Sequence, residues 1–86
     1  GTQQHGHIKL LPTLVHGGED MKLLGILPDE VTQITIYNLA GEKIAQHQSI
    51  GQTSLMLKAQ EQTGCYMLRV QSNSIDQTVK YVVVSY

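Results

Sequence analysis

Apolar and polar residues alternate along most of this chain in short runs, and no stretch repeats its apolar residues at helical spacing. A period of two is typical of strands that bury one face. Gly, Pro, Asn and Ser lie between the runs, where they favour turns. The pattern predicts seven strands, at residues 8–11, 21–27, 31–39, 42–47, 53–58, 64–71 and 78–85.

Seven short strands in one small chain favour an all-β fold, an immunoglobulin-like antiparallel β-sandwich. The clearest hairpin joins the third and fourth strands, because the side chain of Asn38 can open a turn and Gly41 can close it with a positive φ. This turn indicates a hairpin with a bulge. The strand at 21–27 is apolar on both faces at its middle, so we expect it at the centre of its sheet. A helical turn over 58–62 is an alternative, although five residues are too few for a stable helix alone.

One apolar cluster is expected to hold the fold together, because 86 residues make a single small domain. The chain has no Trp and no Phe, so aliphatic side chains and the four tyrosines must fill this core. Residues 1–7 are polar and lack periodicity, and we expect a flexible lead-in or the remainder of a cleaved tag before one domain at 8–86. The expected core residues are Ile34, Ile36, Leu55, Leu57, Tyr66, Leu68 and Val70.

Charge and composition argue against two kinds of partner. Six basic and seven acidic residues give a net charge of −1 and are spread along the chain, so no basic stripe is available for a nucleic-acid backbone. No run approaches the ~20 apolar residues of a membrane span, and the first residues lack the features of a signal peptide. We therefore expect neither nucleic-acid binding nor a membrane-spanning segment.

Reactive residues are few. Cys65 is the only cysteine, and we expect a small buried hydrophobe because no basic neighbour activates it. His5 and His7 can in principle share a metal ion with a third histidine, but no other ligand stands at a spacing that would complete the site. The acidic pairs at 19–20 and 29–30 lie in turns, where carboxylates are normally solvated. With no Gly-x-Ser-x-Gly elbow either, the sequence predicts no enzyme, no metal and no cofactor.

Two tyrosines and two lysines each admit two interpretations. Tyr37 and Tyr66 can offer rings that stack on sugars, or they can be half-buried strand residues with hydroxyls at the rim. We favour the second because both lie in mid-strand. Lys43 and Lys80 can protect sheet edges from pairing with other chains, or they can form part of a recognised surface.

Several short motifs together resemble a known family. The chain has an opening strand that contains Pro, a Tyr-Asn-x-x-Gly turn, a Gly-x-Tyr start to an apolar strand, and a Lys before the final apolar run. From about residue 10 to the end, it is similar to the C-terminal sorting domain of the type IX secretion system, the Por secretion tail of Bacteroidetes. Asn38 stands where that family usually has Asp, and Glu61 where it usually has an apolar residue. The matching positions are Pro12, Tyr37, Asn38, Gly41, Lys43, Gly64, Tyr66 and Lys80.

The resemblance implies a non-catalytic address for export. A cargo N-terminal to residue 1 would cross the inner membrane by a signal peptide, fold in the periplasm and pass through the outer-membrane machinery to the cell surface or the medium. In that family a sortase-like peptidase removes the domain, here upstream of about Ile8, and attaches the cargo to surface lipopolysaccharide. Lys43 and Lys80 are the expected surface for recognition by the machinery.

The alternative is a small stand-alone secreted module with an immunoglobulin-like fold, or an accessory domain of a surface protein that serves adhesion or glycan binding. The full-length gene separates these hypotheses. Several hundred residues before residue 1 would favour the address, whereas a signal peptide directly before it would favour the stand-alone module.

Overall fold

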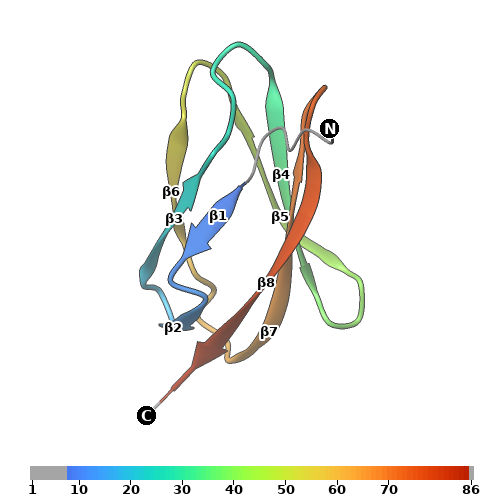
Figure 1. The fold of residues 1–86 in the computed structure, drawn as a ribbon. Helices are drawn as coiled ribbons and strands as arrows, with labels where there is room; N and C mark the ends of the chain where they lie inside the picture. Colours follow the sequence, from blue (N-terminus) through green and yellow to red (C-terminus); the bar gives the residue numbers. More distant parts are fainter. Residues whose placement is uncertain (1–7, 86) are drawn as a thin grey trace, which may run out of the picture.

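The computed structural model of the chain describes residues 8–85, and this part contains eight strands and no helix (Figure 1). All of the strands are short, between three and nine residues. They are β1 (Lys9–Leu11), β2 (Leu14–His16), β3 (Asp20–Leu24), β4 (Thr32–Asn38), β5 (Lys43–Ser49), β6 (Ser54–Lys58), β7 (Gly64–Gln71) and β8 (Asp76–Val84).

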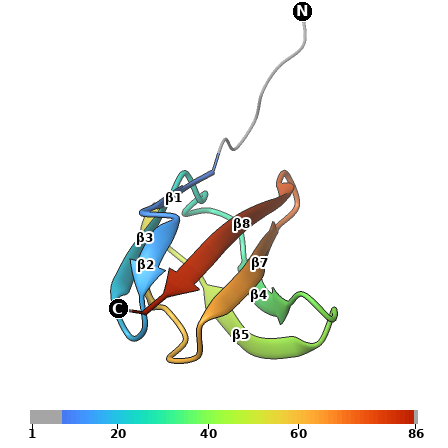
Figure 2. The same ribbon diagram turned by 90° about the horizontal axis from the view of Figure 1, so that it is seen from below.

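The strands form two sheets that face each other. One sheet has three strands in the order β1-β3-β6, and the other has five in the order β2-β8-β7-β4-β5. Seen from one end, the two sheets lie as separate layers with β4, β7 and β8 across from β3 (Figure 2). Neighbouring strands pair antiparallel, except that β2 runs parallel to β8. The all-β prediction with two packed layers is therefore confirmed.

The strand count of seven was wrong, because a further strand, β2, pairs with the end of β8. Its residues Leu14 and Val15 are both apolar, so the sequence shows no alternation of apolar and polar residues that would reveal a strand. The chain leaves the first sheet after β1, passes through Pro12 and Thr13, and joins the second sheet at β2. The Thr13 carbonyl accepts a hydrogen bond from the Val82 amide at 2.8 Å, which holds this crossing against β8.

Most other strand boundaries lie within a few residues of the predicted ones. The bounds of β7 agree with the prediction, and β3 is central in its sheet as expected. β3 ends at Leu24 instead of residue 27, and β8 begins two residues earlier than predicted, at Asp76. The helical turn considered over 58–62 does not form, because β6 extends to Lys58 and the residues after it are irregular.

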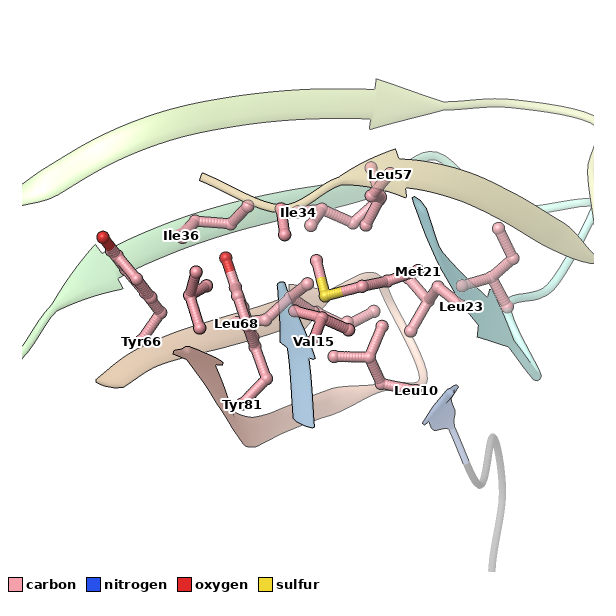
Figure 3. Close-up of a cluster of buried hydrophobic side chains, with 14 of the residues drawn as sticks. Leu10, Val15, Met21, Leu23, Ile34, Ile36, Leu57, Tyr66, Leu68 and Tyr81 are labelled. Atoms are coloured by element: carbon pink, nitrogen blue, oxygen red, sulfur yellow. The ribbon is translucent and has the colours of Figure 1, made fainter. Parts of the chain in front are cut away.

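The core lies between the two sheets, where side chains from both layers point toward one another (Figure 3). Of the predicted core residues, Leu55 is only half-buried at the margin of the cluster, whereas the other six are buried. Tyr81 was not among the predicted core residues, yet it is fully buried. Further buried residues are Leu10, Val15, Met21, Leu23, Ile26, Ala59, Ile75 and Val83.

Candidate functional site

Six of the eight residues that carry the family resemblance fall into two groups on the folded domain. Asn38, Gly64 and Tyr66 line a groove of about 540 Å³ between the β4–β5 turn and the connection from β6 to β7. Tyr37, Lys43 and Lys80 instead lie on the outer face of the five-stranded sheet. The other residues that line the groove are Leu39, Ala40, Ile44, Gln60, Glu61, Gln62, Thr63 and Cys65.

One wall of the groove is the predicted hairpin turn. The Gly41 amide donates to the Asn38 carbonyl, and the Asn38 amide donates to the Glu42 carbonyl, each at 3.0 Å. The side chain of Asn38 closes the turn, since its Oδ1 accepts from the Glu42 amide at 3.0 Å and its Nδ2 donates to Glu42 Oε1 at 2.8 Å. Gly41 has a φ of +86°, which favours glycine. The pairing shifts register between Ile36 and Tyr37, so the hairpin with a bulge is confirmed.

The opposite wall, at residues 60–64, is held by two tyrosine hydroxyls. Tyr66 donates from its hydroxyl to the carbonyl of Gln62 at 2.7 Å, and the Tyr81 hydroxyl donates to Oε1 of Gln60. The two rings stack with centroids 5.5 Å apart and an interplanar angle of 21°. Tyr66 is buried, deeper than the half-buried position that we expected, because its hydroxyl binds the neighbouring connection instead of water.

Burial raises the pKa of Tyr81 from 10.0 to about 12. The folded state thus favours the neutral phenol, so this contribution to stability is complete below pH 10 and is lost as the pH rises from 10 to about 12. Tyr81→Phe should lower the free energy of unfolding by about 1 kcal/mol near neutral pH, because the hydrogen bond to Gln60 is lost. It should also remove this alkaline loss of stability. Urea unfolding at pH 8 and pH 11 tests both effects, and an unchanged difference between the two pH values would contradict this explanation.

Glu61 lies against the turn between β2 and β3. A Cβ atom built on Gly17 would be 2.7 Å from the Glu61 carbonyl oxygen, and one on Gly18 would be 2.6 Å from a Glu61 carboxylate oxygen. The two glycines therefore let this turn approach the groove connection closely, and the Gly18 amide donates to the Gln60 carbonyl at 3.3 Å. The charged residue at position 61 is accommodated at the surface, where it is exposed.

Four residues form one transverse row on the outer face of the five-stranded sheet. Lys43 on β5 pairs with Tyr37 on β4, Tyr37 pairs with Met67 on β7, and Met67 pairs with Lys80 on β8. Because paired residues in adjacent strands project from the same face, all four side chains project away from the core. Tyr37 is half-buried, as predicted, and both lysines are exposed. Sequence reasoning selected three of the four residues and missed Met67, which only the pairing register reveals.

Arg69 and Asp76, which also lie on this face, form an ion pair with each other. Arg69 donates from Nε and Nη2 to the two carboxylate oxygens of Asp76, both at 2.9 Å. The hydrogen bond from Arg69 lowers the pKa of the Asp76 carboxyl, and Asp76 raises the pKa of the Arg69 guanidinium. Lys43 donates to Oε1 of Gln46 at 3.2 Å. Among residues 8–85, neither Lys43 nor Lys80 has an ion-pair partner.

The remaining predicted positions lie elsewhere. Pro12 is exposed at the crossing between the two sheets, away from both groups. Cys65 is half-buried at the groove, instead of buried as expected. The proposed cleavage point upstream of Ile8, the lead-in and the His5 and His7 pair lie outside the described residues. Within the described part of the chain, no three His, Cys, Asp or Glu side chains are grouped to hold a metal ion.

The fold is that of a small all-β domain with two sheets, a groove and an open sheet face. The family of the secretion system C-terminal sorting domain, the Por secretion tail, matches residues 20–85 of this chain. The chain therefore belongs to this family, which acts in type IX secretion. The match begins at the first residue of β3, so Pro12 lies before it. A search of curated proteins found no match. No helix in residues 8–85 has the length and apolar character needed to cross a membrane.

Proposed function

We propose that this domain is a non-catalytic C-terminal address that directs an N-terminal cargo through the type IX secretion system to the cell surface or the medium. The family match over residues 20–85 carries this proposal. The folded domain suits such a role because residues of the sorting motifs occupy the groove and the open face of the five-stranded sheet.

In this mechanism the domain folds in the periplasm and the outer-membrane machinery binds it as a folded unit. The cargo, which precedes residue 1, is then carried across the outer membrane. A sortase-like peptidase would cut in the lead-in upstream of Ile8 and attach the cargo to surface lipopolysaccharide. Tyr37, Lys43 and Lys80 would contact the machinery, whereas Asn38 and Tyr66 would shape the neighbouring groove.

We also propose that the sandwich is immunoglobulin-like. The Tyr66 hydroxyl binds the carbonyl of Gln62, four residues before it at the entrance to β7. This resembles the tyrosine corner of immunoglobulin-like domains. The sheet order supports the same assignment, because β8, β7, β4 and β5 correspond to strands G, F, C and C′, and β1, β3 and β6 correspond to A, B and E. On this assignment, β1 and β2 are two segments of strand A, one in each sheet.

The address is tested by transfer to another protein. Residues 8–86 are fused to the C-terminus of a reporter that otherwise stays in the periplasm, in a bacterium with type IX machinery. We expect the reporter at the cell surface or in the medium, whereas the same reporter without the domain stays inside. Retention of the fusion in the periplasm would reject the address and leave a stand-alone or accessory module as the better interpretation.

A further inference from the structure

The transverse row on the outer face has an apolar centre and a cation at each end. Neighbouring strands lie about 4.8 Å apart, so the backbones of Lys43 and Lys80 are about 14 Å apart across three strand spacings. Tyr37 and Met67 lie between them. Both central side chains are half-buried, and both lysines are exposed. The row therefore offers two separated positive charges with an apolar contact between them.

The apolar centre continues into the next outward-facing row. Cys65 on β7 pairs with Val82 on β8, and Val82 pairs with Leu14 on β2. Cys65 and Val82 are half-buried, and Leu14 is 64% exposed. With Met67 and Tyr37, these residues form an apolar band on the outer face, here called the outer band.

Charge is distributed unevenly between this face and the rest of the domain. The outward-facing charged residues of the five-stranded sheet are Lys43, Arg69, Asp76 and Lys80. The face thus has three basic residues and one acidic residue, whereas the other six of the seven acidic residues lie elsewhere with three basic ones. Since Arg69 is neutralised by Asp76, the charge available to a partner comes from the two lysines of the row.

We propose that this face docks an acidic protein surface of the export machinery. Carboxylates on the partner would meet Lys43 and Lys80, and an apolar side chain between them would cover the outer band. The inference rests on the proposed function and adds the chemistry of the partner. Two separated charges are too few for a lipid surface, which is recognised by clusters of four to eight basic residues, or for a nucleic-acid backbone. Charge complementarity at the ends of an apolar contact is typical of protein partners.

Both lysines also lie at open margins of the sheet. Lys43 belongs to the edge strand β5, and β2 pairs with β8 only from Val82 onward, beyond Lys80. A charged side chain at such a margin opposes pairing with another strand, whatever the sign of its charge. Reversal of the charge therefore separates the two roles, because glutamate keeps this protection but repels an acidic partner.

The test compares three double variants of the reporter fusion. Lys43→Glu/Lys80→Glu should lower the exported fraction on the order of tenfold, because the two glutamates would repel the carboxylates of the partner. Lys43→Arg/Lys80→Arg should be exported like wild type. The matched control is Lys9→Glu/Lys22→Glu, which reverses two exposed lysines of the three-stranded sheet and should leave export unchanged. Thermal unfolding should be nearly the same for all variants, since surface substitutions away from the core usually change stability little.

Two results with the variants would contradict the inference: export of the folded Glu pair at the wild-type level, or an equal loss of export in the control pair. Either result would show that this face does not dock an acidic surface. The proposed address would still stand, because the wild-type fusion is exported. Failure of the wild-type fusion itself would reject both proposals. A second measurement tests a lipid partner, with vesicles of one part phosphatidylglycerol to three parts phosphatidylcholine. If the purified wild-type chain binds these vesicles and the Glu pair does not, the face recognises a lipid surface instead of a protein.

Discussion

Leu68→Ala should lower the free energy of unfolding by about 2–4 kcal/mol. Leu68 is fully buried in β7 and pairs with Ile36 on β4 and Val79 on β8, so it stands in the middle of the five-stranded sheet. Removal of its side chain leaves a cavity that the paired strands cannot close. A loss of this size is a large share of the 5–15 kcal/mol that stabilises a typical domain, so the variant should be close to unfolding.

Urea unfolding of the wild type and the variant measures this effect. The matched control is Leu39→Ala in the β4–β5 turn, where the leucine is 69% exposed. The control should change stability by about 0.5 kcal/mol or less. Equal stability of Leu68→Ala and the wild type would mean that the strand register is wrong by one residue, because such a shift moves every side chain to the opposite face.

Deletion of residues 78–86 should abolish cooperative folding. β8 lies between β7 and β2, so within residues 8–85 its loss leaves β7 with one neighbouring strand and β2 with none. It also removes Tyr81 and Val83 from the core. Without these residues, a domain of this size buries too little apolar surface to offset the conformational entropy of the chain.

Thermal unfolding followed by circular dichroism measures this effect, and the truncated chain should show no cooperative transition. The control is deletion of residues 85–86 alone, which leaves all eight strands in place and should keep the transition. A cooperative transition in the longer deletion would contradict the role given to β8. Since the longer deletion unfolds the domain, a loss of export in that variant would report on folding and not on recognition.

The strands with a clear period of two were predicted well. β7 alternates buried Tyr66, Leu68 and Val70 with half-buried neighbours, and its bounds agree with the sequence prediction. The β4–β5 turn was also predictable, because Asn38 and Gly41 act through contacts with residues close in sequence. Local side-chain chemistry determines these features, so the sequence is sufficient to infer them.

Other features depend on contacts between distant segments. β2 forms only because Leu14–His16 pairs with the end of β8, and nothing near residue 14 indicates that partner. Tyr81 lies in an apolar run with no alternation, so its burial could not be assigned from the pattern. The row from Lys43 to Lys80 requires the register of four strands, which places residues far apart in sequence side by side.

The most direct test of the proposed address is the fraction of the reporter carrying residues 8–86 that leaves the cell, measured in two otherwise identical strains. One strain has type IX machinery and the other lacks its outer-membrane translocon. We expect the reporter outside the first strain and in the periplasm of the second. The same fraction outside in both strains, or retention in both, would contradict the assignment of this domain as a type IX export address.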